Sequence, residues 1–578
     1  IWSVESRESR RPVATSYSLW ERSPAIHELP RRVILIGLSG TGKTSLAPLL
    51  AERLGFEPVD TDAQVEARFG CSIPEIFERF GEPVFRAAER QALLSACARE
   101  RVVIATGGGV VLDEANWVAM RPGSVIVHLQ ASPETIVERL RQQWGSDPRA
   151  VRPLLRGDEP ERRVEALWKE RGVLYARADL TVHTDGKSLE VVAGEIEAAV
   201  RARARGGLVP VVSIGGASGR SDVYVAPGLL TELGRLARSR WSGARAAFVI
   251  SDAAVWQHWG AAVSQALVDA GFQVQSATVP PGEESKSLSQ VERLLDWLLE
   301  HRIDRGDIVV AVGGGVVGDL GGLVASLILR GVGLVQAPTS LLAMVDASVG
   351  GKTAVNHPRG KNLIGTFYQP HLVVADPEVL RTLPAAELRS GWAEVVKHAM
   401  IEVTATGQRP GVLLPLLETA PLERGELDAG WLTRVIRRNI EIKAAVVQAD
   451  EREAGLRRIL NYGHTLGHAI EAAEYRYRHG EAVALGMRAV ARMAAALGLA
   501  DQELVKRQDR LLDRLGLPRH FAGSVDLVLE RLAYDKKAVR GELTWILPVR
   551  PGEVVITREV PREQVLAALG ALRARAVP

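Results

Sequence analysis

A glycine-rich loop near the start of the chain limits the possible fold more than any other feature. The loop is Gly37-Leu38-Ser39-Gly40-Thr41-Gly42-Lys43-Thr44; it follows the apolar run Val33–Ile36 and precedes a helical pattern over Ser45–Leu54. This order of strand, loop and helix is typical of the P-loop, which binds nucleotide phosphates and magnesium. Further apolar runs at Val102–Ala105 and Val125–Leu129 alternate with helical stretches. The alternation predicts a parallel sheet covered by helices.

Length and composition exclude several classes of protein. A chain of 578 residues is too long for one hydrophobic core, so we expect several domains. Its 46% hydrophobic and 24% charged residues are ordinary for a soluble protein, and no apolar run is long enough to span a membrane. The net charge of +3 is scattered, which favours small anionic substrates over nucleic acid. The two cysteines, Cys71 and Cys97, could form one disulfide at most, which fits a reducing compartment, so we expect a cytoplasmic protein. We also expect disorder at residues 1–30.

The second half of the chain has a different pattern. Apolar runs at Ala246–Ile250, Val274–Val279 and Ile308–Val312 predict strands. The last leads into a G-x-G-x-x-G sequence at Gly313–Gly318, which by itself fits either a dinucleotide-binding turn or a plain glycine turn. From about Leu383 to residue 533 helical patterns dominate, followed by one hairpin at Leu543–Leu547 and Val554–Ile556. We therefore predict an α/β/α P-loop domain at 31–200, a linker at 201–208, a Rossmann-like α/β domain at 209–382 and a mainly helical domain at 383–578.

Candidate ligands for a nucleotide and its magnesium lie in the first half. The loop predicts ATP contacts by Gly40, Gly42, Lys43, Thr44 and Ser45, with Thr44 on magnesium. Asp60 and Asp62 follow an expected second strand; one carboxylate could join the magnesium shell and the other could accept a hydrogen bond from a substrate hydroxyl. Helix N-capping is the alternative role for each. Gly107-Gly108-Gly109 permits close approach of the backbone to a ligand.

Candidate metal ligands lie in the helical part of the second half. His464 and His468 are four residues apart and would share one face of a helix, while Glu394 lies in another helical run and His479 precedes Gly480-Glu481. Two histidines and one carboxylate, with open positions for substrate oxygens, are typical of a zinc site. Spacing alone nominates His464 and His468 as the ligand pair.

The first half resembles shikimate kinase over about residues 31–200. The matching stretches are the P-loop, Asp60-Thr61-Asp62, Gly81-Glu82-x-x-Phe85-Arg86, Thr106–Gly109, Arg152–Leu155 and Arg171-x-x-Leu174-Tyr175. The resemblance implies that shikimate contacts Asp62, Arg86, Gly108, Gly109 and Arg171. It also implies that Arg86 and Arg171 clamp the carboxylate, Asp62 orients the acceptor hydroxyl, Asp60 joins the magnesium shell, and Arg152 reaches the ATP phosphates from a lid. Gluconate is the alternative acceptor; the arginine pair and the triple glycine favour shikimate.

Residues 209–578 resemble 3-dehydroquinate synthase over almost their whole length. The matching stretches are Pro281-Gly282-Glu283-x-x-Lys286, Gly313–Asp319, Pro338–Asp346, Gly350–Thr353, Gly360–Gly365, Gly391–Lys397, Leu460–His464 and His479–Glu481. The resemblance implies zinc, or cobalt, on Glu394, His464 and His479, with His468 near the substrate phosphate instead. It implies NAD contacts at Asp252, Glu283, Lys286, Gly314, Gly315, Asp319, Thr339, Ser340, Lys352 and Lys361. The implied substrate is 3-deoxy-D-arabino-heptulosonate 7-phosphate, in contact with Asp346, Lys352, Asn362, Lys397, Lys443, Arg457, Asn461, His468 and Lys536 or Lys537.

The two resemblances together imply a bifunctional enzyme with two non-consecutive steps of the shikimate pathway. The synthase chemistry they imply is oxidation by NAD, elimination of phosphate, return of the hydride and closure of a carbocycle by an aldol step. The synthase half would form a homodimer, as this family does. Related sugar-phosphate cyclases, metal-dependent polyol dehydrogenases and a degenerate scaffold half are the alternatives. The segment Thr404–Gly430 does not match the family, and we interpret it as a surface insertion or an altered helix.

Overall fold

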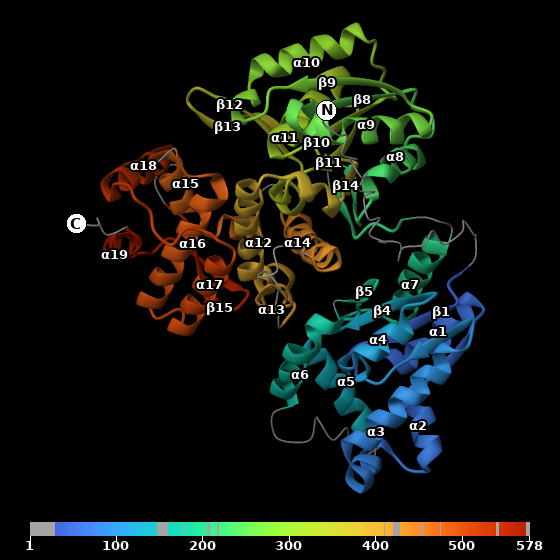
Figure 1. Ribbon diagram of the computed structural model, residues 1–578. Helices are drawn as coiled ribbons and strands as arrows, with labels where there is room; N and C mark the ends of the chain where they lie inside the picture. Colours follow the sequence, from blue (N-terminus) through green and yellow to red (C-terminus); the bar gives the residue numbers. More distant parts are fainter. Residues whose placement is uncertain are drawn as a thin grey trace, which may run out of the picture.

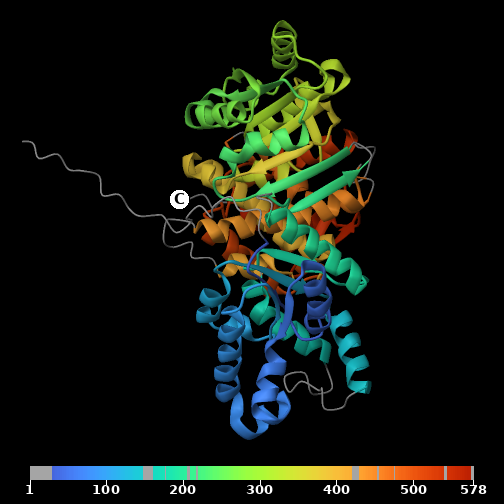
Figure 2. The ribbon, with the colours of Figure 1, turned by 90° about the vertical axis from the view of Figure 1, so that its right-hand side faces the viewer.

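The computed structural model shows one lobe for the first half of the chain and two joined lobes for the second half (Figures 1 and 2). The structure describes residues 29–146, 160–175, 177–204, 208–216, 219–409, 411–419, 428–451, 453, 455–473, 476–538 and 543–573. Most of the segment 1–30, the linker glycines and Arg152 therefore lie outside the described residues. Within the described ranges no helix is both long and apolar enough to cross a membrane.

The first lobe is a parallel sheet covered by helices. In the described part of the chain its strands have the order β2-β3-β1-β4-β5, and all of its strand pairs are parallel. The strands are β1 (Arg32–Ile36), β2 (Glu57–Asp60), β3 (Val102–Ala105), β4 (Ser124–Gln130) and β5 (Leu180–His183). The helices are α1 (Lys43–Leu54), α2 (Thr61–Phe69), α3 (Ile73–Cys97), α4 (Glu114–Met120), α5 (Pro133–Ser146), α6 (Pro160–Tyr175) and α7 (Leu189–Ala204).

The second lobe has a larger sheet of order β6-β7-β14-β11-β10-β8-β9 among the described residues, parallel except for the β6–β7 pair. Its strands are β6 (Val212–Gly216), β7 (Gly219–Val225), β8 (Ala246–Asp252), β9 (Gln273–Val279), β10 (Ile308–Gly313), β11 (Gly333–Pro338) and β14 (Leu372–Ala375). Its helices are α8 (Leu233–Arg240), α9 (Ala253–Asp269), α10 (Leu288–Glu300) and α11 (Gly315–Leu327). A separate hairpin, β12 (Lys352–His357) with β13 (Gly360–Phe367), projects beside it.

The third lobe is mainly helical and packs directly on the second. Its helices are α12 (Ala385–Thr406), α13 (Leu413–Glu418), α14 (Ala429–Ala449), α15 (His464–Ala473), α16 (His479–Ala496), α17 (Gln502–Arg514), α18 (Val525–Ala538) and α19 (Arg562–Leu572). A hairpin of β15 (Trp545–Arg550) and β16 (Glu553–Thr557) completes it. One hydrophobic core runs from β8 and β10 into α12 and α16, so the second and third lobes share their interior.

The α/β architecture and the helical C-terminal region are as predicted. The strand predicted at Val33–Ile36 is confirmed as β1, that at Ile308–Val312 as β10, and the late hairpin as β15–β16. The β12–β13 hairpin was not predicted, because β13 is largely exposed and neither strand shows apolar–polar alternation in its sequence, although Thr353 and Val355 of β12 are buried. Its shape comes instead from cross-strand backbone pairing beside α11.

The interpretation of Thr404–Gly430 as a surface insertion is wrong for its described residues. Helix α12 continues to Thr406, and α13 then buries Leu413, Leu414, Leu416 and Leu417. Helix α13 packs against α12 and α14 on one side and against α6 of the first lobe on the other. The described part of the segment is therefore helical and packed, and it lies between the two halves of the chain.

Polar contacts hold the first lobe to this segment and to α14. The Gln408 amide nitrogen lies 3.0 Å from the ring nitrogens of His183 at the end of β5. The Arg437 guanidinium donates to the Asp179 carbonyl at 3.3 Å. Val412 packs into the core of the first lobe rather than that of the third. The two halves therefore meet through specific contacts.

Candidate functional sites

The P-loop has the geometry expected of a phosphate-binding loop. It connects β1 to α1, and Gly40 and Gly42 have φ values of +85° and +95°, which L side chains rarely adopt. The Lys43 ammonium is held at the loop by the carbonyls of Gly37 and Leu38, at 2.8 and 2.9 Å. The Thr44 hydroxyl donates to the Asp60 carboxylate at 2.8 Å. A hydroxyl and a carboxylate so placed offer two oxygens to one magnesium ion. Asp60 also caps α2 through the N–H of Ala63, so its capping and metal-binding roles are compatible.

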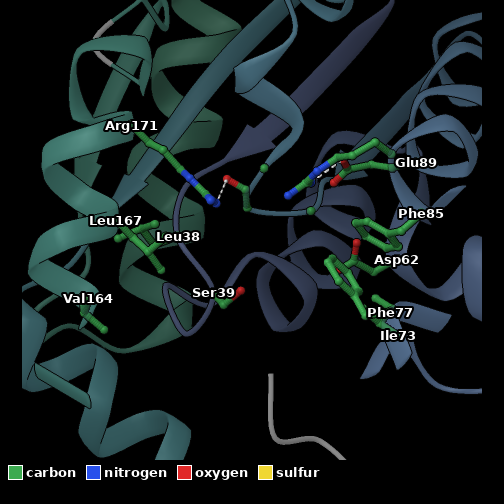
Figure 3. Close-up of a pocket in the computed structure, with 14 residues that line it drawn as sticks. Leu38, Ser39, Asp62, Ile73, Phe77, Phe85, Glu89, Val164, Leu167 and Arg171 are labelled. Atoms are coloured by element: carbon green, nitrogen blue, oxygen red, sulfur yellow. Dashed lines mark hydrogen bonds and ion pairs between the residues drawn. The ribbon is translucent and has the colours of Figure 1, made fainter. Parts of the chain in front are cut away.

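A pocket opens beside the loop, with α6 on one side and α2 and α3 on the other (Figure 3). Arg171, Leu167 and Val164 of α6 form one wall. Asp62, Glu89 and Phe85 face them from α2 and α3. Arg171 donates to the Gly108 carbonyl at 3.3 Å, and the buried Glu89 holds Arg86 through a contact of 2.7 Å. The pocket therefore offers two guanidinium groups and two carboxylates to a small polar ligand.

Two of the three glycines leave room for the charged side chains beside them. A Cβ on Gly109 would lie 2.1 Å from the Arg86 guanidinium, and a Cβ on Gly107 would lie 2.3 Å from the Glu89 carboxylate. Glu89 was missed from the sequence, although its position three residues after Arg86 on a helix would have allowed the pair to be found. Burial raises the pKa of Glu89, and the charge of Arg86 opposes that shift.

In the third lobe, Glu394 and three histidines meet at the junction of α12, α15 and α16. One Glu394 carboxylate oxygen lies 3.3 Å from Nε2 of His464 and 3.4 Å from Nε2 of His479. His464, His468 and His479 have ring nitrogens within 4.8 Å of one another. Both carboxylate oxygens of Glu394 are buried without a hydrogen bond of normal geometry among the described residues. A carboxylate and imidazoles in this arrangement fit a divalent metal ion of the zinc type.

Outer contacts orient these groups. His479 Nδ1 lies 3.2 Å from Glu471, and His464 Nδ1 lies 3.2 Å from the Tyr462 carbonyl. Such contacts leave Nε2 of each ring directed at the metal position. Burial disfavours a charged His479, yet hydrogen bonds to Glu394 and Glu471 raise its pKa to about 9. The carboxylates of Glu394 and Glu471 therefore favour a positive charge at the position of His479. Glu471 was not predicted, because no motif includes it.

Asp346 and two lysines lie next to this centre. Lys397 contacts Glu394 at 2.5 Å and Asp346 at 2.7 Å, and Lys443 forms an ion pair with Asp346. Burial opposes the charge of Lys397, but Asp346 and Glu394 raise its pKa to about 12. Burial lowers the pKa of Lys443 to about 8, although Asp346 favours its charged form. Lys397, Lys443, Asp346 and Glu394 therefore form one buried network of ion pairs beside the histidines.

Other predicted substrate residues flank this cluster. Arg457 donates to the Gly350 carbonyl at 3.0 Å, and Asn461 donates to Glu453 at 3.2 Å. Lys352 forms an ion pair with the same glutamate, which the sequence did not suggest. The α18 backbone includes Lys536 and Lys537, but their side chains lie outside the described part.

The predicted dinucleotide residues surround the carboxyl ends of the strands in the second lobe. Gly314 and Gly315 begin α11 directly after β10, and Asp252 caps α9 after the neighbouring strand β8. This is the edge at which parallel sheets bind dinucleotides. Lys286 contacts both Asp319 and Asn362 at 2.5 Å.

The remaining predicted residues lie on adjoining segments. Glu283 accepts from Asn356 at 2.8 Å, and Lys361 of the β13 strand contacts Glu471 at 2.6 Å. Ser340 lies close to Gly314, since a Cβ added to that glycine would be 3.4 Å from the Ser340 hydroxyl oxygen. The Thr339 N–H donates to the Gly313 carbonyl. Glu471 thus links the hairpin to the histidine centre.

The fold and the sites define a P-loop kinase joined to an α/β enzyme that has a candidate dinucleotide edge and a candidate metal site. The shikimate kinase family model matches residues 39–201. The models for the N-terminal and C-terminal parts of 3-dehydroquinate synthase match residues 276–390 and 391–538.

The chain is also similar to individual proteins. The 3-dehydroquinate synthase of Gloeobacter violaceus is 48% identical over 349 residues, which are 60% of this chain and 92% of that relative. The structure of 2-epi-5-epi-valiolone synthase from Streptomyces hygroscopicus, with NAD⁺ and Zn²⁺ bound, is 31% identical with a TM-score of 0.55 and covers 61% of this chain and 96% of its own. Shikimate kinase from Acinetobacter baumannii, in complex with shikimate, is 32% identical with a TM-score of 0.29 and covers 31% of this chain and 96% of its own.

The chain belongs to the 3-dehydroquinate synthase family and carries a shikimate kinase domain in addition. It is a bifunctional enzyme of the shikimate pathway.

Proposed function

We propose that the first lobe transfers the terminal phosphoryl group of magnesium-bound ATP to the 3-hydroxyl of shikimate. Lys43 and the loop N–H groups would bind the phosphates, and Thr44 and Asp60 would hold the magnesium ion. Asp62 would orient the acceptor hydroxyl, while Arg86 and Arg171 would bind the carboxylate of shikimate. The Asp62 carboxylate and the guanidinium groups of Arg86 and Arg171 line one pocket beside the P-loop, which supports this assignment.

We propose that Glu394, His464 and His479 hold a zinc or cobalt ion in the second half, and that NAD binds along the edge formed by Gly314, Gly315 and Asp252. The metal ion would supply Lewis-acid polarisation of a substrate hydroxyl, and NAD would supply a reversible acceptor for hydride. The relative from Streptomyces was solved with NAD⁺ and Zn²⁺, which supports both cofactors.

The substrate would be 3-deoxy-D-arabino-heptulosonate 7-phosphate, and the product 3-dehydroquinate with release of phosphate. Lys443, Arg457 and His468 would bind the anionic groups, and Lys397 would keep Asp346 charged beside the reacting carbon. Burial lowers the pKa of His468 to about 3, so its ring is neutral at physiological pH and acts as a hydrogen-bond partner. We further propose that the enzyme is cytoplasmic and forms a homodimer through its synthase half.

The buried Glu394 carboxylate beside the histidines carries the synthase proposal most directly. The test is phosphate release from the heptulosonate phosphate with catalytic NAD and zinc and without ATP. We expect release with no accumulation of NADH, because the hydride returns within each turnover. Stoichiometric NADH would instead indicate a polyol dehydrogenase, and no release would refute the assignment of substrate.

A further inference from the structure

A second cavity lies between the two halves of the chain, behind α6 and away from the kinase pocket. Its first-lobe side comes from the ends of β4 and β5, from α6 and from Ala178. Its other side comes from α13, from Val412 just before it, and from α14 of the third lobe. Neither half alone forms this cavity.

The two sides of the cavity differ in chemistry. Trp168, Ala178, Val412 and Leu416 form an apolar side, while Arg434, Arg437 and Arg438 approach from α14, with Glu441 as the one acidic residue among its described lining. Glu402, Glu441 and Gln408 already satisfy Arg438. Arg437 donates to the Asp179 carbonyl of the first lobe, so Arg434 is the arginine of this side that offers a buried, unpaired Nε among the described residues.

Two buried nitrogens at this cavity have no partner among the described residues. His128 is 2% exposed, and its Nε2 forms no hydrogen bond. The Nε of Arg434 is likewise buried without an acceptor. Burial lowers the pKa of Arg434, only partly opposed by Asp428, and Arg177 and Arg121 lower it further. A buried polar group without a partner destabilises the folded chain, and a charged one does so more strongly. A bound anion would remove this cost.

We propose that this cavity is a second ligand site, which takes a small organic carboxylate with a compact apolar body. The carboxylate would accept hydrogen bonds from Arg434 and from the His128 ring. The body would lie against Trp168 and Leu416. A phosphate ester fits less well, because the apolar residues leave little room for a second set of polar oxygens.

The site is connected to the kinase pocket through α6. The His128 ring stacks on Tyr175 with centroids 4.9 Å apart, and the Tyr175 hydroxyl donates to the Gly108 carbonyl at 2.5 Å. Arg171 donates to the same carbonyl. Trp168 faces the second cavity, whereas Leu167 and Arg171 face the kinase pocket. Occupancy would shift α6 and so change the KM for shikimate; this step rests on the proposed kinase site.

The test uses the full chain and benzoate as the probe, with benzamide as its uncharged counterpart. Binding is measured by calorimetry with shikimate in excess, so that the carboxylate clamp of the kinase pocket is occupied. Arg434→Gln removes the charge, and Ala178→Leu fills the apolar side without changing charge. Arg235→Gln, an exposed arginine of α8, is the matched control. Thermal unfolding and both basal activities verify that the variants are folded.

We expect one benzoate per chain and no binding of benzamide. Arg434→Gln should weaken benzoate binding about tenfold or more, as expected for a hydrogen bond to a charged group. Ala178→Leu should abolish binding, and Arg235→Gln should leave it unchanged. No saturable binding, or binding that neither cavity variant weakens, would overturn the site. Binding without any change in the KM for shikimate would overturn the coupling alone. The binding result needs no turnover, so it is independent of the proposed kinase activity.

Discussion

The Arg438→Met substitution tests whether the contact between the halves depends on one buried ion pair. The Arg438 guanidinium contacts Glu402 at 2.7 Å, Glu441 at 3.0 Å and Gln408 at 2.8 Å. Glu402 is 0% exposed, and its other oxygen accepts the Leu413 N–H at 2.8 Å. Methionine keeps most of the side-chain volume but leaves the Glu402 carboxylate buried beside a single donor.

The expected cost follows from that uncompensated charge. Removal of one partner from a buried pair costs about 3–5 kcal/mol of unfolding free energy. The second and third lobes share one core and should unfold together, and a unit of about 370 residues loses roughly 1.3 °C in transition temperature for each kcal/mol. Differential scanning calorimetry should therefore show the transition of the synthase half lowered by about 4 °C or more. The kinase lobe should lose only its attachment through Gln408.

The double variant Glu402→Gln with Arg438→Met separates charge from packing. Neutral glutamine removes the buried charge, so most of the lost stability should return. A single variant with an unchanged transition would refute the reasoning. A double variant with the summed loss of both single variants would show that the pair is not coupled.

Three further predictions concern the active sites. Lys443 is charged below about pH 8, so the kcat/KM of the synthase should fall as the pH rises through that value. The kinase activity of the same chain should not show this decline, and a synthase profile that stays flat across the alkaline range would contradict the prediction. Glu394→Gln should lower bound zinc, measured by elemental analysis, by about 100-fold or more, with kinase activity kept; normal zinc content would exclude Glu394 as a ligand. Arg171→Met should raise the KM for shikimate about tenfold or more with the KM for ATP unchanged, and an equal rise for both substrates would contradict the carboxylate clamp.

Features with a local cause were predictable from the sequence. The P-loop follows from glycine spacing between a strand and a helix, and the strand predicted at Ile308–Val312 is β10. The histidine pair His464 and His468 was visible from helical spacing. His479 and Glu394 come from other helices, so spacing could not join them to the pair; the family resemblance did.

Features that depend on contacts between distant segments were not predictable. Val412 and Gln408 have no unusual local pattern, yet they contact the first lobe more than 200 positions earlier in the chain. Arg438 on α14 passes for a solvated helix charge in the sequence, but it is 8% exposed. Glu89 and Glu471 likewise gain their roles only once α3 and α15 are placed beside their partners.

The central claim is that one chain holds two independent active sites. The most direct test assays shikimate-dependent ADP formation and phosphate release from the heptulosonate phosphate in the wild type, Lys43→Ala and His464→Ala. We predict that Lys43→Ala loses the kinase and keeps the synthase, and that His464→Ala loses metal and the synthase and keeps the kinase. If either substitution abolishes both activities in a chain that still unfolds as the wild type does, the account of two separate sites is wrong.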